Sequence, residues 1–435
     1  MGRRGSLGTR YRRLWTAAAI SYLGDGVFLT ALPLIATAAD PRPAGVTIVT
    51  TAGSLPWLLF ALTSGAIADR FARLTLMWRA DVARTVITAG LAAAILTGHR
   101  SIASLAVAAF ALGTCETLFD TASQAVLPEL VADDADELTR ANGRLETANV
   151  AANQFLGPPL GGFLTAIAPA LPVLTNAVSF AASAISLRSV GPTPVPRAVG
   201  SRTPLRGDIK AGLAWLWNHH RLRTLAVAVG AINFALTAGF TLLVLVTRVY
   251  SHLGPAGYGL ILTAAAVGST LGGLTLHRLT DRVPATRAIA VVPGVLGIAQ
   301  IAIAIHPTTA VIAGALAVTG YAVTTWNILT VTYRQRTVPT EFLGRVNSVY
   351  RLIAYGTMPL GAVLGGVLAT ATSLRVPYVV GGALLIATTL LVVPRDEPAT
   401  SPTAIAGDDS RAPQEPATVP VKVARDARRR SKTST

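Results

Sequence analysis

The chain has 435 residues, of which 51% are hydrophobic and 13% are charged, against roughly 25% charged residues in an ordinary soluble domain. This composition excludes the soluble domains that the length alone would suggest and indicates an integral membrane protein. The single cysteine, Cys115, excludes disulfides and cysteine-based metal sites, and we expect no metal and no other cofactor.

The positions of the basic residues explain the net charge of +16. If the N-terminus is cytoplasmic, most of the 37 Lys and Arg residues fall in the expected inner segments. Cytoplasmic loops of membrane proteins carry this excess, whereas a nucleic-acid-binding protein gathers its charge on one face. The charge therefore predicts a multi-pass protein of the inner (plasma) membrane, with both termini cytoplasmic and no nucleic-acid partner. Only four basic residues fall in expected outer loops: Arg42, Arg100, Arg248 and Arg375.

The first predicted element is an apolar run over residues 14–39, which follows a basic segment at residues 1–13. Residues 36–38 resemble a signal-peptide cleavage site. The run is nevertheless too long for the apolar region of a signal peptide, and further spans follow it. We therefore expect a first transmembrane helix with a cytoplasmic segment before it.

Asp25 lies eleven residues into this helix, about 16 Å along it and close to the bilayer midplane. Ionisable side chains are costly at that depth, so this carboxyl group is a candidate proton-coupling residue. Gly24 and Gly26 flank it and could open the local backbone, as interrupted helices do in transporters. A structural hydrogen bond to a neighbouring helix explains Asp25 equally well.

Eleven further apolar runs are long enough to span a membrane. Very short connections, such as residues 168–171, require neighbouring helices to form antiparallel hairpins. We predict an all-α integral membrane protein with 12 transmembrane helices in two six-helix halves, residues 14–188 and 224–393. The further runs lie near residues 44–68, 74–96, 101–123, 143–168, 171–188, 224–247, 257–276, 287–305, 309–332, 345–370 and 375–393.

The loop after the second predicted span, residues 65–73, reads GAIADRFAR. It resembles the signature G-x-L-a-D-r-x-G-r-k of the major facilitator superfamily, matching at Gly65, Asp69, Arg70 and Arg73 but with alanine at the second glycine. The resemblance implies an inner gate in which Asp69 faces the N-terminus of the eleventh helix, where a helix dipole favours a carboxylate. It also implies that Arg73 pairs with an acid of the fourth helix, where Asp120 stands.

Two pairs of ionisable residues follow in the third and fourth predicted spans. Asp81 and Arg84 are three residues apart, which predicts a local ion pair. Glu116 and Asp120 are one helical turn apart and should face the same way. We assign Asp120 to the inner gate and Glu116 as a second proton-coupling candidate that could also contact a cationic substrate.

Residues 140–162 and 345–366 form an internal repeat. Arg-x-Asn recurs from Arg140 to Arg345, a shift of 205, and Gly-x-x-Leu-Gly-Gly recurs from Gly157 to Gly361, a shift of 204. The spacing therefore drifts by one residue. Glycines let membrane helices approach closely, so a generic packing face is the alternative explanation of each copy taken alone.

The first copy also contains Gly157-Pro158-Pro159-Leu160-Gly161-Gly162, which resembles the fifth-helix signature G-P-x-x-G-G of exporters in the same superfamily. The resemblance implies an antiporter motif at Gly157, Pro158, Gly161 and Gly162. Asn153 stands where the longer signature has glycine. Over about residues 14–393, segments such as LGDGVFLTALPL and LGRVNSVYRL are similar to the enterobactin-exporter-like and macrolide-efflux-like branch.

The two halves are joined by residues 189–223, a proline-rich and basic linker. Leu205, Ile209, Leu213 and Leu216 fall on one helical face, which predicts an amphipathic helix on the inner membrane surface. A solvated turn is the alternative. Residues 394–435 are rich in Pro, Ala, Thr and charge, and we expect a disordered cytoplasmic tail.

Four aromatic or amide residues at mid-depth are candidates for a substrate cavity: Phe28, Asn233, Phe234 and Tyr321. The resemblance places their helices, with the fourth, around a central cavity. A mostly apolar cavity favours amphiphilic ligands, although each aromatic residue is also explained by packing.

These observations predict a monomeric secondary active exporter, a proton antiporter for amphiphilic small molecules such as drugs or siderophores. A polytopic membrane enzyme is one alternative, but the six histidines are dispersed without metal-ligand spacing. A non-transporting membrane sensor is the other alternative, and it would normally carry a recognisable soluble domain.

Overall fold

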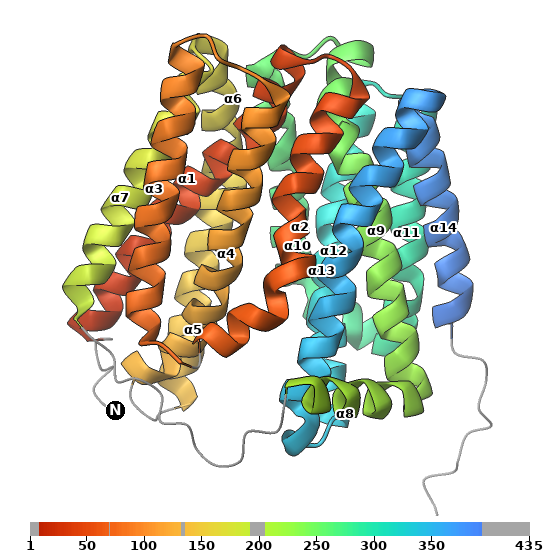
Figure 1. Cartoon of the computed structure of the whole chain (residues 1–435). Coiled ribbons are helices and arrows are strands. Elements are labelled where there is room, and N and C mark those ends of the chain that lie inside the picture. The colour runs from red at the N-terminus through yellow and green to blue at the C-terminus, as the bar shows by residue number, and fades with distance from the viewer. Residues whose placement is uncertain (1–7, 69, 132–134, 192–204, 394–435) are drawn as a thin grey trace, which may run out of the picture. The chain divides into compact units, whose positions relative to one another are not determined.

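A computed structural model describes residues 8–68, 70–131, 135–191 and 205–393. All regular secondary structure in these ranges is helical (Figure 1). The predicted tail at 394–435, Asp69 of the predicted gate and part of the linker, 192–204, lie outside the described residues.

The helices follow the predicted spans closely, with one exception in the fifth. That span begins with the polar α5 and is divided into three consecutive segments. The helices before the linker are α1 (Thr9–Ala39), α2 (Pro43–Ala68), α3 (Arg73–Leu96), α4 (Ile102–Leu130), α5 (Ala135–Asn149), η1 (Val150–Leu156), α6 (Gly157–Ile167) and α7 (Ala170–Val190). The later helices are α8 (Leu205–Asn218), α9 (His220–Tyr250), α10 (Pro255–Arg282), α11 (Ala285–Ile305), α12 (Thr309–Thr337), α13 (Thr340–Ala371) and α14 (Val376–Val392).

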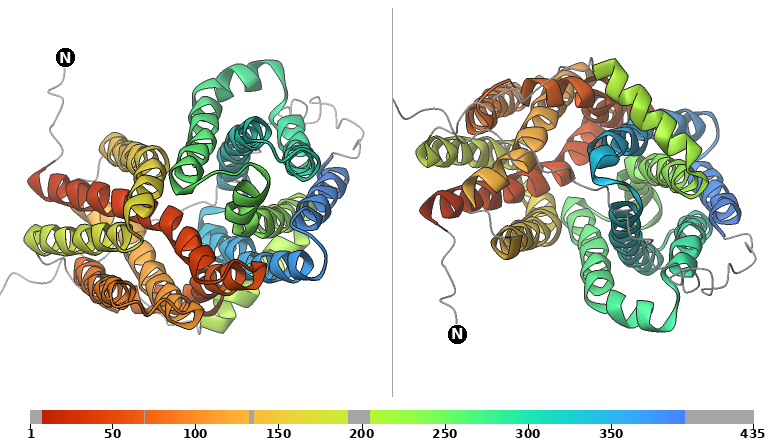
Figure 2. Two further views of the ribbon diagram at one scale, coloured as in Figure 1. Left: turned by 90° about the horizontal axis from the view of Figure 1, so that it is seen from above. Right: turned by 90° about the horizontal axis from the view of Figure 1, so that it is seen from below.

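The packing of α1 to α7 recurs in α9 to α14. In the first group α1 and α3 pack on α7, α2 and α3 pack on α4, and α6 packs on α1. In the second group α9 and α11 pack on α14, α10 and α12 pack together, α11 packs on α12, and α13 packs on α9. The groups meet through two matching pairs, α2 with α13 and α6 with α10 (Figure 2).

The glycines of the internal repeat are the points of closest approach between these helices. Gly157 has no room for a Cβ atom because the backbone of Gly26 in α1 lies against it, and Gly361 is closed in the same way by the backbone of Phe234 in α9. Gly162 meets α10 at Gly259. These contacts agree with the packing explanation of the repeated glycines, whereas the antiporter role of the first copy remains a prediction.

The one-residue drift of the repeat has a structural cause in η1. This segment is a π-helix, and the amide of Gly157 donates to the carbonyl of Ala152, five residues earlier. A π-helical turn accommodates one extra residue without changing the direction of the flanking α-helix. The second copy lies in the uninterrupted α-helix α13, so the longer first copy forms the π segment and the shorter second copy does not.

The apolar core joins the two groups of helices at only one end of the bundle. At the end where α1 connects to α2, one cluster contains residues of both groups, including Ile35, Val46, Leu242 and Tyr258. At the opposite end, where α8 lies, the described residues form two separate clusters. One draws on α1, α3, α4, α5 and α7, and the other on α8, α9 and α11 to α14. The two groups are therefore packed together at one end and separately at the other.

Nine helices in the described part of the chain are long and apolar enough to cross a membrane. The other three predicted spans fall short for visible reasons. Within α3, Arg79, Asp81 and Arg84 interrupt the apolar residues, the fifth span is divided by η1, and α14 has only 17 residues.

The predicted linker helix is present as α8, which packs on α13 and α9. Leu216 is fully buried, and Gly212 lies against the backbone of Arg345. Leu213 and Trp217 are exposed, so the helix keeps an apolar outer face. The side chains of Leu205 and Ile209, which complete the predicted stripe, lie outside the described residues.

The glycine contacts generate a stability prediction with a matched control in the same predicted span. Gly162→Ala places a methyl group against the backbone of α10 and should destabilise the protein by about 1–3 kcal/mol through overpacking. Gly143→Ala in α5 meets nothing within 4 Å, so the better helix propensity of alanine should leave the midpoint of thermal unfolding unchanged or raised. Equal midpoints for the two purified variants would contradict the packing role of Gly162.

Candidate functional site

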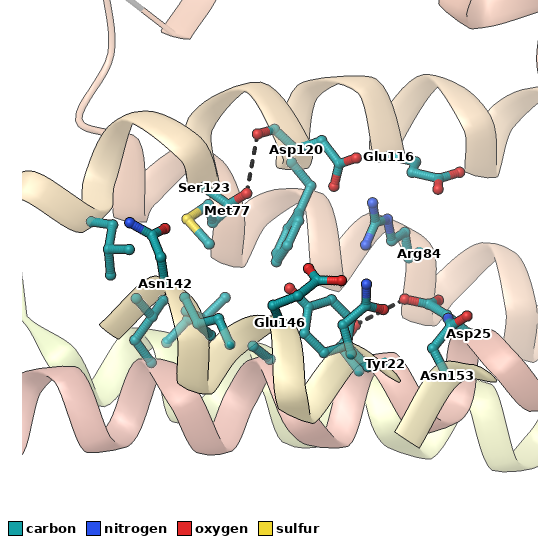
Figure 3. A pocket seen from close by; sticks show the side chains of 18 residues that line it. Tyr22, Asp25, Met77, Arg84, Glu116, Asp120, Ser123, Asn142, Glu146 and Asn153 are labelled. Atoms are coloured by element: carbon teal, nitrogen blue, oxygen red, sulfur yellow. Dashed lines mark hydrogen bonds between the residues drawn. The ribbon is translucent and has the colours of Figure 1, made fainter. Parts of the chain in front are cut away.

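A cavity of about 410 Å³ opens among the helices of the first group (Figure 3). Its walls come from α1, α3, α4, α5, η1 and α7, so it lies within this group. The polar residues that line it are Ser21, Tyr22, Asp25, Arg84, Glu116, Asp120, Ser123, Asn142, Glu146, Asn149 and Asn153.

The α1 wall carries the predicted proton-coupling residue. Asp25 lines the cavity, and Ser21, one turn earlier, donates a hydrogen bond of 3.4 Å to its carboxylate. The expectation that Gly24 and Gly26 open the backbone was wrong, because α1 is a continuous helix through both. They are instead close-approach points: Gly24 lies against Ser179 of α7, and Gly26 against the backbone of Asn153 in η1. Side chains of α7 on one side and the backbone of η1 on the other therefore fix the position of Asp25.

The α4 wall carries Glu116 and Asp120. Both line the cavity, as their spacing of one turn predicts. The hydroxyl of Ser123 donates to the backbone carbonyl of Asp120 at 3.0 Å, which leaves the carboxyl group directed toward the cavity (Figure 3). The two acids therefore extend along about one helical turn of this wall.

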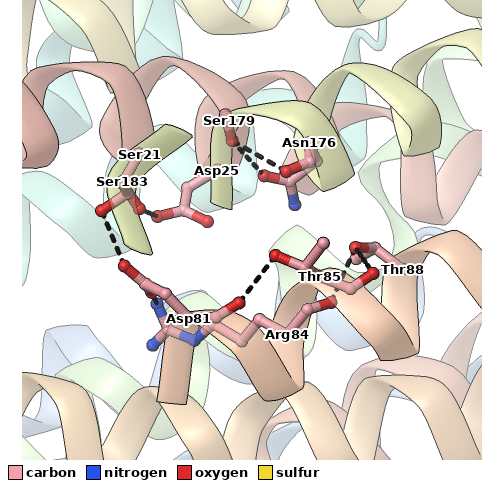
Figure 4. A network of polar contacts seen from close by, with 9 residues as sticks. All are labelled: Ser21, Asp25, Asp81, Arg84, Thr85, Thr88, Asn176, Ser179 and Ser183. Atoms are coloured by element: carbon pink, nitrogen blue, oxygen red, sulfur yellow. Dashed lines mark hydrogen bonds and ion pairs between the residues drawn. The ribbon is translucent and has the colours of Figure 1, made fainter. Parts of the chain in front are cut away.

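The predicted ion pair of α3 is confirmed and is almost completely buried. Arg84 lies 3.3 Å from Asp81, and the side chains are 4% and 0% exposed. Ser183 of α7 donates to the second oxygen of Asp81 at 2.6 Å (Figure 4). The guanidinium group also lies over the rings of Phe119 and Phe180, at 4.7 and 5.2 Å from their centroids. Arg84 is thus held from three helices while it lines the cavity.

Together α5 and η1 supply a wall of three amides and one acid, and we did not predict from the sequence that they form one face. Asn142, Glu146, Asn149 and Asn153 all line the cavity. Their spacing of four, three and four residues places them on one face of a helix, so this polar stripe was visible in the sequence. Asn149 directly precedes the π segment, and Asn153 lies within it.

The cavity contains more carboxyl groups than cations. Asp25, Glu116, Asp120 and Glu146 line it together with one guanidinium group, which is already paired with Asp81. An excess of acids inside a membrane protein suits the binding of protons or of an organic cation. Among the residues described, no three His, Cys, Asp or Glu side chains come together as a metal site.

The four predicted substrate contacts lie elsewhere. Phe28 packs against the cluster that joins the two groups of helices. Asn233 donates to the carbonyl of Ala354 at 2.7 Å, and Tyr321 accepts a hydrogen bond of 3.1 Å from Thr275. Phe234 lies against Gly361 through its backbone. None of the four lines the cavity described above, and their contact with substrate remains a prediction.

The predicted gate is described only in part. Gly65 lies in the last turn of α2, Arg70 is exposed in the following turn, and Arg73 begins α3. The pairing of Arg73 with Asp120 and the position of Asp69 therefore remain predictions. In the predicted antiporter motif, Gly157, Pro158, Gly161 and Gly162 are all buried, with Gly161 against the backbone of α1.

Residues 8–426 match the protein family described as transmembrane secretion effector. The chain is 28% identical over 394 residues to the multidrug efflux pump Tap of Mycobacterium tuberculosis, covering 87% of this chain and 91% of that protein. It is 26% identical over 400 residues to YfiS of Bacillus subtilis, described as an uncharacterized MFS-type transporter, covering 86% and 90% of the two chains.

Solved structures share the fold at low sequence identity. A bacterial homologue of the iron transporter ferroportin in its inward-facing state superposes with a TM-score of 0.69 at 18% identity, covering 89% of this chain and 99% of that chain. The nucleoside transporter NupG gives a TM-score of 0.68 at 11% identity, covering 88% and 98%.

The buried ion pair generates a double-mutant prediction. Arg84→Gln leaves Asp81 buried without its cation and should cost about 3–5 kcal/mol of unfolding free energy. Adding Asp81→Asn removes the orphaned charge, so the double variant should be more stable than Arg84→Gln alone. Thermal unfolding of both variants and of Asp81→Asn completes the cycle. Additive losses would show that the two side chains do not act as a pair.

Proposed function

Because the chain belongs to the transmembrane secretion effector family of the major facilitator superfamily, we propose that it exports amphiphilic small molecules in exchange for protons. The family and its relatives make it a membrane transporter and not an enzyme. The observation that carries the exchange mechanism is the cavity in which Asp25, Glu116 and Asp120 face one another around a single, already paired cation.

The cavity supports a substrate with both apolar and cationic character. Its acids attract a positive charge, while Phe119, Met77, Leu127 and Leu145 provide apolar contact area in the same walls. A proton and an organic cation compete for the same carboxylates, which is the requirement for exchange. Efflux of drugs, as the name of the Tap relative states for that protein, is the assignment that fits this chemistry.

The proposed architecture is twelve transmembrane helices in two six-helix halves, α1 to α7 and α9 to α14, with α5, η1 and α6 counted as one span. The recurring helix pairs and the paired glycine contacts support it. If both termini are cytoplasmic in the plasma membrane, the two separate clusters lie on the cytoplasmic side, and their separation supports an inward-open arrangement of a monomer. A membrane sensor of the same fold would lack the exchange function.

Transport in everted membrane vesicles tests this proposal. Vesicles containing the full chain should accumulate ethidium, hydrophobic antibiotics or siderophores only when a proton gradient is imposed. Accumulation that persists after the gradient is collapsed would exclude proton coupling. No accumulation of any probe, together with no proton flux on adding probe, would favour the sensor.

Asp25 provides the first prediction from this function. Asp25→Asn keeps the size of the side chain but cannot exchange a proton, so it should abolish gradient-driven ethidium transport in liposomes while the protein still folds. Glu116→Gln is the comparison, because Glu116 is the second proton-coupling candidate. Full transport by Asp25→Asn would assign the proton to another carboxyl group.

The inner gate provides the second prediction from this function. If Arg73 pairs with Asp120 when the inner side closes, Arg73→Asp and Asp120→Arg should each reduce transport about tenfold or more, and the double exchange should restore part of it, because close charge pairs couple by up to ~3 kcal/mol. Single variants that are as active as the wild type, or a double variant weaker than both, would argue against this pair.

A further inference from the structure

The two copies of the repeat identify a partner position for Asp25. Gly157 and Gly361 are equivalent in the repeat, and the backbone that closes each one belongs to Gly26 and Phe234, respectively. The residues immediately before these two are Asp25 and Asn233. Asp25 in α1 and Asn233 in α9 therefore occupy equivalent positions against the repeat helix.

In the second copy, two hydrogen bonds close this contact between α9 and α13. Asn233 donates from its amide to the carbonyl of Ala354 at 2.7 Å. Thr357 donates from its hydroxyl to the carbonyl of Gly230 at 3.0 Å. Each bond joins a side chain of one helix to the backbone of the other, so the pair fixes the two helices in register.

The first copy has the same positions but lacks this closure. The place of Thr357 is taken by Asn153, four residues before the equivalent glycine. The residue equivalent to Ala354 is Asn149 by the shift of 205 and Val150 by the shift of 204. The π segment that contains the extra residue begins at this point. Among the described residues the carboxyl group of Asp25 has one hydrogen bond, from Ser21 of its own helix, and the cavity lies beside it.

We propose that Asp25 makes the contact that Asn233 makes in the second copy, but only when its carboxyl group is protonated. A carboxylate only accepts hydrogen bonds, whereas a carboxylic acid also donates one, as an amide does. When the Asp25 carboxylate takes up a proton, the new O–H donates to the carbonyl of Asn149 or Val150 and adds a hydrogen bond between α1 and η1, which already touch at Gly26 and Asn153. When the proton leaves to water, this hydrogen bond is lost and the carboxylate is free to face substrate in the cavity.

The extra residue of the first copy makes such a switch possible. A π turn is less regular than an α turn, and one residue more than the α-helix needs allows the segment to shift between arrangements. The corresponding part of α13 is an uninterrupted α-helix, and the side-chain amide of Asn233, which does not titrate, donates a hydrogen bond to it. The chain therefore has one fixed contact and one adjustable contact at equivalent places.

The charged and titratable groups around Asp25 come from α1, α3, α4 and α5. Arg84 provides the only positive charge among the cavity-lining residues, and α7 contributes only the neutral Asn176 and Ser179 next to Gly24. The titratable groups are Tyr22 of α1, Asp81 and Arg84 of α3, Glu116 and Asp120 of α4, and Glu146 of α5. Variants at Asp25 itself are needed to separate its proton from these.

Hydrogen exchange on the full chain in lipid nanodiscs, without substrate, tests the switch. Exchange of the amides at residues 150–156 is followed across pH and corrected for the intrinsic rate. Asp25→Asn should protect the segment at every pH, and Asp25→Ala should leave it unprotected at every pH. On acidification, exchange of this segment in the wild type should slow from the rate of Asp25→Ala to the rate of Asp25→Asn. The expected change is about fivefold, the factor typical of one net hydrogen bond.

The second copy offers the matched control. Asn233→Asp installs a carboxyl group opposite Ala354 and should make exchange at residues 354–360 depend on pH, whereas the wild-type segment should not respond. Equal effects of Asp25→Asn and Asp25→Ala on residues 150–156, or a pH response that persists in both, would overturn the proposal.

This inference rests on the proposed role of Asp25 in proton exchange, but the two fail in different ways. If transport proves independent of a proton gradient while the exchange pattern holds, the switch stands and the transport cycle needs another driving force. If Asp25→Asn abolishes gradient-driven transport and residues 150–156 show no pH response, Asp25 carries the proton without the switch.

Discussion

The fold depends on a backbone-to-backbone approach that only glycine permits. Gly157 and Gly161 hold the fifth span on α1, and Gly361 and Gly365 hold α13 on α9. In a membrane, where burial in lipid gives little drive for helix association, such close contacts supply much of the packing. Gly162 and Gly366 extend the same two helices onto α10 and α2, so the two groups of helices meet through the same frame.

The two copies of the repeat differ by a single extra residue, and we propose that exchange depends on this asymmetry. The extra residue is absorbed as η1, next to the acidic cavity, and the equivalent place in α13 is closed by Asn233 and Thr357. The ionisable residues follow the same division, because the acids that line the cavity belong to the first group of helices. We propose that one copy of the repeat serves stability and the other serves exchange.

Much of the fold was predictable from the sequence because apolar runs, glycine frames and i,i+3 charge spacing are local signals. The helix positions and the pair Asp81–Arg84 were obtained in this way. The π segment was present as a drift of one residue, but its conformation depends on which flanking contacts stay fixed. The hydrogen bond from Asn233 to Ala354 could not be predicted. The depth of a residue in a predicted span does not show whether its polar side chain faces a cavity or the backbone of a neighbouring helix.

We propose that protons and cationic amphiphiles compete for the carboxyl groups around Asp25. Proton release on binding tests it most directly, using the purified chain in weakly buffered solution with a pH-sensitive dye and tetraphenylphosphonium as the probe. We expect the wild type to release protons as the probe binds, and Asp25→Asn to bind the probe with markedly reduced release. Binding without proton release in the wild type, or equal release from both proteins, would contradict it.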